Sequence, residues 1–254
     1  MTKAANEPGT STIGPGAIDI VSRVLHRDGL MLVIDKPAGI PVHRGPRNSR
    51  DKSGAALEDY FDALRFGLPR QPVLAHRLDR DTSGCLVLGR HRKATASLGL
   101  LFKHNKISKS YWAVVEGGPE GDTGTIDIPL GRLNEERGWW QKPDPNGLPS
   151  TTNWQVLGRS ADPDMKLTWL ALEPVTGRTH QLRVHCAAMG WPITGDSIYG
   201  TAPREGGAML HLHARQISVP LSKNKPPVTV VAPVPNHMRQ RLKLCGWQDM
   251  SESA

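Results

Sequence analysis

The fold of this chain is limited above all by a succession of short strand-like runs that alternate with turn residues. Residues 30–34 are continuously apolar and precede a turn-forming Asp-Lys-Pro sequence, which predicts a buried strand. Residues 151–160 and 165–174 predict an antiparallel hairpin. Because strands and hairpins outnumber helices, we expect an α+β fold with a mixed, largely antiparallel central sheet and helices packed around it. The same criteria predict further strands at 85–90, 110–117, 210–221 and 228–233, and helices at 56–64, 94–105, 180–189 and 236–244.

The length of 254 residues, without an internal repeat or an abrupt change of composition, predicts a single folded domain. We place this domain at residues 18–247, between a disordered N-terminal tail at 1–17 and a C-terminal tail at 248–254. Within the domain, residues 131–150 combine basic, aromatic and proline residues and predict a long loop.

The charge of the chain favours an anionic partner. Its formal net charge is +8 and its isoelectric point is near 9.6, so nucleic acid is the first candidate and an anionic membrane surface the second. No apolar run approaches the ~18 residues of a membrane span, and the N-terminus lacks the apolar core of a secretory signal. The three cysteines form no C-x-x-C pair. We therefore expect a cytoplasmic protein without a disulfide framework or a thiolate zinc site.

Two aspartates stand in a costly position in the sequence AHRLDRDTSG at residues 75–84. They lie between two predicted strands, where an unpaired buried carboxylate takes up a proton or destabilises the fold. In an extended segment residues 77 and 79 point to the same side, so Arg77 is the expected neighbour of Asp79. One interpretation is a structural ion pair, with Asp81 and Thr82 capping a turn. The other is a functional carboxylate.

The predicted helix at 180–189 carries a second charged cluster. Thr179 is its expected N-cap, and His180 and Arg183 share one face of the helix. Arg183 belongs either to a solvated face or to a cleft, where it would pair with a carboxylate or a phosphate. A zinc site built from His180, His185 and Cys186 lacks the usual ligand spacing, so no metal is expected.

Two adjacent tryptophans, Trp139 and Trp140, stand between Arg137 and Lys142. They predict either a platform on which nucleic-acid bases stack or an apolar wall at the base of the loop. The sequence favours neither interpretation over the other.

Four motifs follow one another along the chain: HRLDRDTSG, SKSYWAVVEG, PVTGRTHQLRVH and GWPITGDSIYG. In that order they resemble the RluA-type RNA pseudouridine synthases. The resemblance extends from LMLVIDKPAGIPVH to LHLHARQISVPL and so covers roughly residues 24–234. It implies a single pseudouridine-synthase catalytic domain with a central active-site cleft, in the short form of the family that has no N-terminal S4 RNA-binding domain.

The resemblance assigns roles residue by residue. The family's catalytic aspartate falls on Asp79, its tyrosine on Tyr111, and the arginine that pairs with the aspartate on Arg183. The arginine implicated in holding the site from which a uridine has been flipped falls on Arg77. Other residues of the motifs are expected to contact the RNA substrate, namely His76, Arg80, Thr82, Arg178 and His180.

By this resemblance the chain isomerises uridine to pseudouridine in ribosomal RNA, transfer RNA or both. An ionised Asp79 would attack C1′ of the ribose or remove a proton at C2′, after which uracil rotates and reattaches through C5. Tyr111 would stack on the uracil and take up or pass on the C5 proton. No cofactor is expected, because neither redox nor phosphoryl chemistry occurs. We expect a monomer whose partner is RNA, with no obligate protein partner and structural roles for Asp81 and Asp196.

Two other functions compete with this one. A non-catalytic RNA-binding or ribosome-assembly protein on the same fold would be expected to have lost Asp79. A glycoside hydrolase would use Asp79 and Asp81, but two aspartates at i and i+2 across a turn are poorly placed to flank a sugar bond. The complete set of motif residues therefore favours the uridine isomerase.

Overall fold

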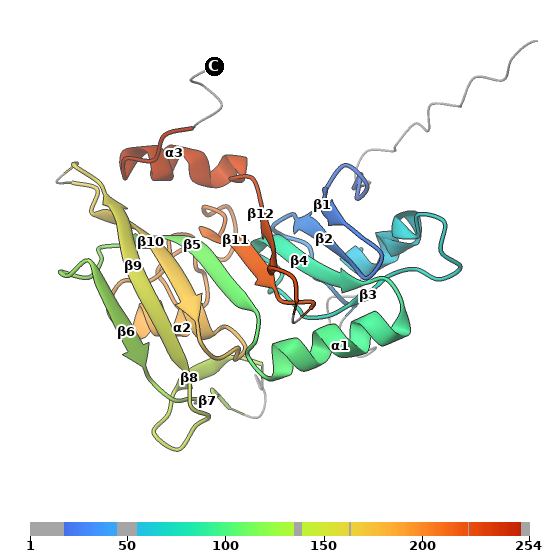
Figure 1. Cartoon of the computed structure of the whole chain (residues 1–254). Helices are drawn as coiled ribbons and strands as arrows, with labels where there is room; N and C mark the ends of the chain where they lie inside the picture. Colours follow the sequence, from blue (N-terminus) through green and yellow to red (C-terminus); the bar gives the residue numbers. More distant parts are fainter. Residues whose placement is uncertain (1–17, 45–54, 135–138, 163, 223, 250–254) are drawn as a thin grey trace, which may run out of the picture.

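The computed structural model describes residues 18–44, 55–134, 139–162, 164–222 and 224–249. The tail expected at 1–17 and most of the tail expected at 248–254 lie outside these ranges. None of the described helices is long and apolar enough to cross a membrane. The elements, drawn in Figure 1, are β1 Val24–Arg27, β2 Met31–Lys36, the 3-10 helix η1 Leu57–Leu64, β3 Val73–Leu74, β4 Ser83–Gly89, α1 Arg92–Lys103, β5 Ser108–Glu116, β6 Thr123–Asp127, β7 Leu130–Arg132, β8 Gln141–Pro143, β9 Thr151–Arg159, β10 Leu167–Pro174, α2 Gln181–Ala188, β11 Leu212–Val219, β12 Val228–Val231 and α3 Asn236–Leu244.

Ten strands form one sheet in the order β1-β2-β4-β11-β5-β10-β9-β6, with β3 paired to β4 and β12 paired to β11. Every pairing in this sheet is antiparallel except that of β4 with β11. The expected α+β fold with a mixed, largely antiparallel sheet is therefore confirmed. In Figure 1 the half that contains β1 to β4 and the half that contains β5 to β10 lie on either side of β11.

Each half of the sheet has its own apolar core. The core of the first half joins β2 and β4 to η1 and α1, and all seven residues of β4 are buried. The core of the second half joins β5 and β10 to α2. The segment predicted as an amphipathic helix buries Leu57, Phe61 and Leu64 as its spacing requires, although it is a 3-10 helix. Helix α3 covers β5 and β10 with Met238 and Leu242.

The segment 131–150, expected to be a plain loop, contains a short hairpin. Strands β7 and β8 pair in a separate two-stranded sheet, with Gly131 opposite Lys142. A β-carbon on Gly147 would fall on the carbonyl group of Leu130, so the return of the chain after β8 needs a glycine. The loop prediction is wrong at this point because backbone pairing between these few residues leaves little trace in a period-2 pattern.

The start of α2 also differs from the prediction. Thr179 is not the N-cap, because the helix begins at Gln181 and His180 takes the cap position in a left-handed conformation, with φ 53° and no side-chain cap. The side-chain oxygen of Gln181 accepts hydrogen bonds from Thr176 Oγ1 at 2.7 Å and from the backbone N–H of Arg178 at 3.0 Å. The side chain of Gln181 therefore binds the loop that precedes α2, a role expected for the N-cap Thr179.

The parallel contact between β4 and β11 is short and lies at the centre of the sheet. It consists of Ser83 opposite His213 and Gly84 opposite Ala214, and Ser83 Oγ lies 2.8 Å from His213 Nδ1. Gly84 has a φ of 103°, and a β-carbon at this position would fall on the backbone carbonyl of Ala214. A glycine is therefore needed for the two halves to approach this closely.

We predict that Gly84→Ala lowers the free energy of unfolding by about 3 kcal/mol or more, because the methyl group meets backbone and the residue must keep a positive φ. Urea unfolding monitored by tryptophan fluorescence measures the loss. Gly99→Ala in α1 is the matched control, since nothing lies within 4 Å of its added carbon. Alanine there should raise stability by ~0.5–1 kcal/mol. If Gly84→Ala were as stable as the wild type, the contact between β4 and β11 would tolerate a side chain.

Candidate active site

The segment that carries Asp79 is a turn between β3 and β4. The backbone N–H of Thr82 donates to the carbonyl of Asp79 at 3.2 Å, so the rule that residues two apart face the same side does not apply here. The basic side chains beside the Asp79 carboxylate are accordingly His180 and Arg183. This corrects the expectation that Arg77 is the charged neighbour of Asp79.

The carbonyl groups of this turn converge on one buried cation. Lys36, the last residue of β2, is completely buried. Its Nζ donates to the carbonyl oxygens of Pro37 at 2.9 Å, Arg80 at 2.8 Å and Thr82 at 2.9 Å. Burial lowers the pKa of Lys36 to about 7, although nearby carboxylates oppose this shift. In its protonated form Lys36 offers three protons to these three acceptors and so fixes the backbone of the turn directly after Asp79.

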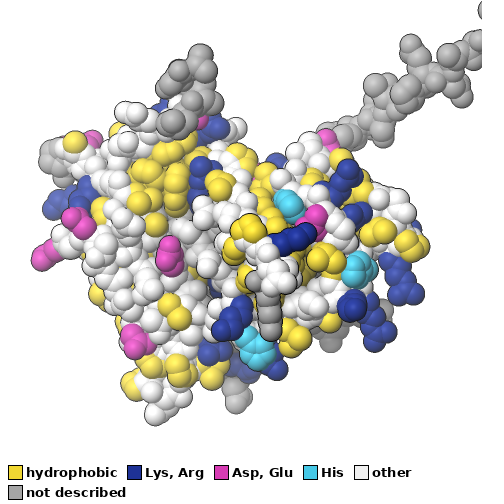
Figure 2. Space-filling view, in the orientation of Figure 1, with side chains coloured by type: hydrophobic (Ala, Val, Ile, Leu, Met, Phe, Trp, Pro, Cys, Tyr) yellow, Lys and Arg dark blue, Asp and Glu magenta, His cyan; other side chains and the backbone are white. Residues whose placement is uncertain are grey.

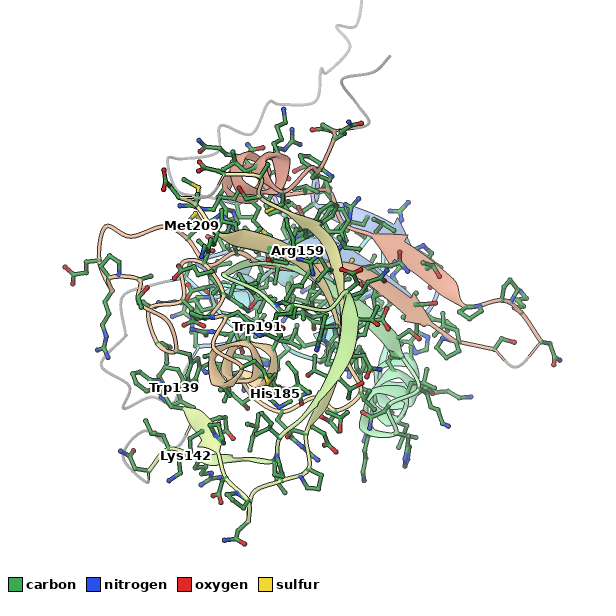
Figure 3. The ribbon with its side chains drawn as sticks, turned by 90° about the vertical axis from the view of Figure 1, so that its left-hand side faces the viewer. Trp139, Lys142, Arg159, His185, Trp191 and Met209 are labelled. Atoms are coloured by element: carbon green, nitrogen blue, oxygen red, sulfur yellow. The ribbon has the colours of Figure 1, made fainter. Side chains whose placement is uncertain are left out.

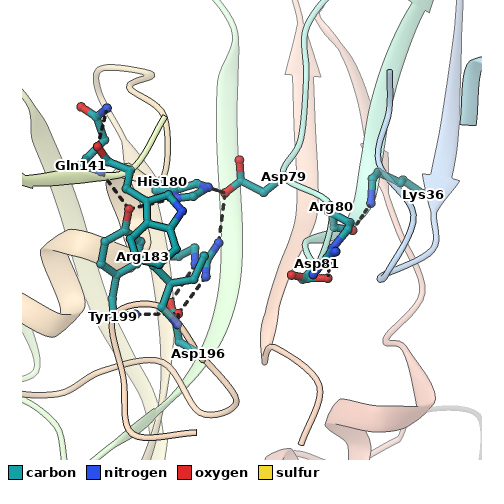
Figure 4. A network of polar contacts seen from close by, with 11 residues as sticks. Lys36, Asp79, Arg80, Asp81, Gln141, His180, Arg183, Asp196 and Tyr199 are labelled. Atoms are coloured by element: carbon teal, nitrogen blue, oxygen red, sulfur yellow. Dashed lines mark hydrogen bonds and ion pairs between the residues drawn. The ribbon is translucent and has the colours of Figure 1, made fainter. Parts of the chain in front are cut away.

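Two donors from the second half of the sheet reach the same oxygen of Asp79, as Figure 4 shows. His180 Nε2 lies 3.7 Å and Arg183 Nη1 lies 3.9 Å from Asp79 Oδ2. Both distances exceed the length of a hydrogen bond, so within the described part of the chain neither carboxylate oxygen of Asp79 accepts one. The arrangement therefore places two basic side chains beside one carboxylate oxygen and leaves the carboxylate able to contact a ligand.

Arg183 is bound firmly to a different carboxylate. Its Nε and Nη2 donate to the two oxygens of Asp196, each at 2.8 Å, and both side chains are buried. Asp196 also accepts the backbone N–H groups of Ile198 and Tyr199. Although burial acts in the opposite direction, these hydrogen bonds keep the pKa of Asp196 below its usual range and the pKa of Arg183 above it. Arg183 therefore belongs to a cleft and not to a solvated helix face, with Nη1 left to face Asp79.

These side chains lie in the wall of a pocket of about 550 Å³, a size typical of ligand sites. Asp79 is the one acidic residue among the described residues that line it. Asp196 balances the charge of Arg183, so the pocket keeps an excess of positive charge and suits an anionic ligand. The basic residues of the lining are Arg77, Lys103, Lys109, Arg178 and Arg183. Figure 2 shows further Lys and Arg side chains gathered over α1 and the β1 to β4 half.

Tyr111 and His76 face the pocket as uncharged groups. Burial raises the pKa of Tyr111, helped by the nearby charge of Asp79, so its hydroxyl group stays protonated. His76 stacks on Phe102 with ring centres 4.3 Å apart, and its Nε2 accepts the backbone N–H of Val87. Burial lowers the pKa of His76 to about 3, so its ring is neutral. Because Nε2 accepts, the neutral ring carries its proton on Nδ1, so it can stack or donate a hydrogen bond but adds no charge to the pocket.

Most of the residues predicted from the sequence come together in this pocket. Arg80 does not line it, because its Nε pairs with Asp81 Oδ1 at 3.1 Å on the side of the turn that faces Lys36 (Figure 4). Asp81 is likewise absent from the lining, so it does not flank a ligand together with Asp79. The predicted residues that do line the pocket are His76, Arg77, Asp79, Thr82, Tyr111, Arg178, His180 and Arg183.

Three residues of the site were missed by the sequence analysis. Lys109 lines the pocket two residues before Tyr111, and this spacing on one strand face is a signal that predicts it. Tyr199 stands in the GDSIYG motif, and its hydroxyl group contacts His180 Nδ1 at 2.8 Å. Nothing in the sequence indicates the burial of Lys36. No group of three His, Cys, Asp or Glu side chains among the described residues could hold a metal ion.

The two tryptophans, for which the sequence left two interpretations open, have different surroundings in the structure. Trp139 is 58% exposed, and its ring meets the ring of His180 edge to face with centres 5.5 Å apart. Figure 3 places Trp139 beside α2, on the side of the β7–β8 hairpin. Trp140 is half-buried, and the guanidinium of Arg204 lies over its ring. Trp139 is therefore a surface ring beside the site, whereas Trp140 packs at the base of the hairpin.

Comparison with known proteins agrees with this geometry. The family model of RNA pseudouridylate synthase matches residues 30–188. An uncharacterized RNA pseudouridine synthase of Zymomonas mobilis is 41% identical over 218 residues, which cover 85% of this chain and 95% of the relative. The ribosomal large subunit pseudouridine synthase C of Vibrio cholerae is 34% identical over 227 residues, which cover 86% of this chain and 68% of the relative.

A solved structure leads to the same family. The human RNA pseudouridylate synthase domain containing 4 is similar with a TM-score of 0.73 and 26% identity, over 91% of this chain and 95% of that chain. The matches cover both halves of the sheet and the turn that carries the pocket carboxylate. The chain therefore belongs to the RluA-type RNA pseudouridine synthases, which are isomerases that convert uridine in RNA to pseudouridine.

Proposed function

We propose that this chain isomerises specific uridines of structured RNA as a monomer, with Asp79 as the catalytic carboxylate. The observation that carries the proposal is the carboxylate of Asp79 in the wall of a basic pocket, with His180 and Arg183 beside Oδ2 and no hydrogen bond to either oxygen from the described residues. Ribosomal RNA is the first candidate substrate, because a relative is named as a ribosomal large subunit enzyme. Transfer RNA is the second.

The excess of positive charge in the pocket supports the entry of a flipped nucleotide. Moving a base out of its stack costs a few kcal/mol, which contacts to the phosphates can offset. Arg77 and Arg178 line the pocket and are exposed, so both can reach the backbone of an RNA. We assign phosphate binding to these two arginines, and we place the exposed Arg80 at the rim of the site.

The reaction needs one ionised oxygen beside the ribose. Asp79 Oδ1 attacks C1′ or removes the proton at C2′, and either route breaks the bond between C1′ and N1 of uracil. The base then rotates, and a bond forms between C5 and C1′ as the bond from Asp79 to C1′ breaks in the first route, or as Asp79 returns its proton to C2′ in the second. The proton lost from C5 is matched by a proton gained at N1, so the product is an isomer of the substrate. Tyr111 stacks on the uracil, and its protonated hydroxyl group relays the C5 proton.

The RNA and the modified position are tested by mapping pseudouridine in ribosomal and transfer RNA from cells with and without this protein. The proposal expects one or a few ribosomal positions to lose the modification. Restoring the gene should restore them, and restoring the Asp79→Asn form should not. Loss of positions in transfer RNA alone would transfer the assignment to that substrate, and an unchanged map would contradict the proposed function.

We predict that Asp79→Asn lowers turnover by on the order of 1,000-fold or more while RNA affinity stays within about threefold, because the amide keeps the size and loses the ionised oxygen. Asp81→Asn is the matched control. Its carboxylate pairs with the exposed Arg80 outside the pocket, so turnover should be retained. Tritium release from C5-labelled uridine in RNA measures both variants. Equal losses of turnover in two folded variants would remove the distinction between the aspartates.

Arg183→Met should lower the free energy of unfolding by ~3–5 kcal/mol, because the buried carboxylate of Asp196 loses its partner. Arg159→Met is the matched control, since Arg159 pairs with an exposed Asp122, and it should cost less than about 1 kcal/mol. Chemical denaturation measures both. If the two variants lose the same stability, the pair of Arg183 with Asp196 is not the structural anchor described above.

Trp139→Ala should raise the Kd for RNA about tenfold, because an exposed ring beside the pocket loses a stacking contact worth ~1–3 kcal/mol. Leu148→Ala is the matched control, since Leu148 is 59% exposed and bridges to Leu130 on the same hairpin. Fluorescence anisotropy with a labelled RNA gives both constants at one salt concentration. An unchanged Kd for Trp139→Ala would assign the ring to packing against His180 alone.

A further inference from the structure

His180 is held in a conformation that its sequence position does not explain. It is a non-glycine residue with φ 53° and ψ 14° at the N-cap of α2, a backbone state that costs about 1–3 kcal/mol and that clusters at functional sites. Its side chain is buried, and the rings of Trp139 and Tyr199 meet it edge to face, each with centres 5.5 Å apart. The surroundings therefore determine where both ring nitrogens point.

The hydrogen bonds around Tyr199 determine where the proton of His180 lies. The backbone N–H of Gln141 lies 3.0 Å from Tyr199 Oη, and a backbone N–H can only donate. Tyr199 Oη also lies 2.8 Å from His180 Nδ1. Among the described residues this nitrogen is the one acceptor within hydrogen-bond distance of the Tyr199 hydroxyl proton. Donation of this proton to Nδ1 would satisfy both groups, and a neutral imidazole would then carry its own proton on Nε2.

We propose that Tyr199 fixes the proton of His180 on Nε2 and thereby makes His180 a donor that positions the Asp79 carboxylate. His180 Nε2 is the atom that faces Asp79 Oδ2 (Figure 4). With the proton on Nδ1, the lone pair of Nε2 would face a carboxylate oxygen 3.7 Å away, which is repulsive. The role of His180 rests on the proposed function of Asp79, whereas the proton position does not.

The environment keeps His180 neutral, as the proposal requires. The charged groups around its ring are Asp79, Asp196, Arg77 and Arg183. Burial lowers the pKa of His180, and the two arginines lower it further while the two carboxylates act in the opposite direction. Burial also raises the pKa of Tyr199, so its hydroxyl group keeps the proton that it donates.

The consequence for Asp79 is directional. The Nε2–H of His180 and the guanidinium of Arg183 both lie beside Oδ2, so their attraction favours an orientation of the carboxylate that keeps Oδ2 toward them. A rotation of the carboxylate that moved Oδ2 away from these two groups would weaken both attractions. His180 is thus a positioning residue, and Tyr199 acts on Asp79 through it.

The proton position is tested directly by long-range ¹H–¹⁵N NMR on protein labelled at histidine. His180 is assigned by comparison with His180→Gln. The wild type should show a protonated Nε2 and an unprotonated Nδ1 near neutral pH. A protonated Nδ1 in the wild type would overturn the proposal, whether or not an RNA substrate is known.

Tyr199→Phe tests the effect on catalysis, because it keeps the ring and removes the hydroxyl group. It should lower kcat about tenfold and change KM by less than about twofold, since the hydrogen bond that fixes the proton of His180 is lost. Tyr60→Phe is the matched control, because Tyr60 packs against the core of the first half away from the pocket. This control should keep the wild-type kcat.

The pH profile separates positioning from a loss of packing. In Tyr199→Phe, lowering the pH through the pKa of His180, which burial keeps below its usual range, protonates both nitrogens and restores a proton on Nε2. The ratio of its kcat to that of the wild type should therefore rise as the pH falls. A constant ratio, or a kcat equal to that of Tyr60→Phe, would overturn the positioning role. Absence of turnover in the wild type with every RNA would contradict the proposed function, and the NMR result would still decide the proton position.

Discussion

A short parallel contact between β4 and β11 joins the half of the sheet that carries Asp79 to the half that carries its two donors. The contact is made by Ser83 with His213 and by Gly84 with Ala214, and the first pair is separated by 130 residues along the chain. Closing so long a loop costs chain entropy that the apolar cores of both halves must offset. The pocket therefore forms only when the two halves are joined, and small changes in this contact alter the distance between a carboxylate and its donors.

The buried charges of the second half serve this geometry. An isolated buried ion pair is a weak source of stability, because removing two charges from water is costly. The carboxylate of Asp196 nevertheless accepts four hydrogen bonds, two from Arg183 and two from backbone N–H groups. This set of bonds fixes the guanidinium plane, so that its remaining nitrogen approaches Asp79 at a defined position. The free-energy cost of burying Arg183 and Asp196 is thus accompanied by a fixed orientation of the guanidinium group beside Asp79.

Part of this architecture can be predicted from the sequence, because local patterns determine it. The apolar run of β4 and the spacing of Leu57, Phe61 and Leu64 indicate buried elements without knowledge of the rest of the chain. The site residues were predicted from motifs and their resemblance to a family. Eight of the nine were then found in the lining of one pocket. Their roles in the reaction stay predictions.

Other features could not be predicted because they depend on distant contacts. The predicted charged neighbour of Asp79 was wrong because the chain turns from Asp79 to Thr82 instead of extending, and the carbonyl groups of this turn are bound by Lys36 from another strand. The N-cap predicted for α2, Thr179, was wrong because His180 adopts a left-handed conformation. Tyr199, 19 residues away, helps to hold this conformation. Propensity alone disfavours this conformation for a histidine. Residues whose local preference is overruled in this way are those closest to the candidate chemistry.

The ammonium group of Lys36 also determines how far the Asp79 turn can be treated as an independent module. Two of its three carbonyl ligands, Arg80 and Thr82, lie 44 and 46 residues further along the chain. Transplanting the HRLDRDTSG segment alone into another scaffold would leave these carbonyls without their donor, even if both flanking strands were reproduced. The smallest transferable unit consists of β2 with its terminal lysine, the turn and β4. Protein engineers who wish to move this carboxylate must therefore move an internal cation with it.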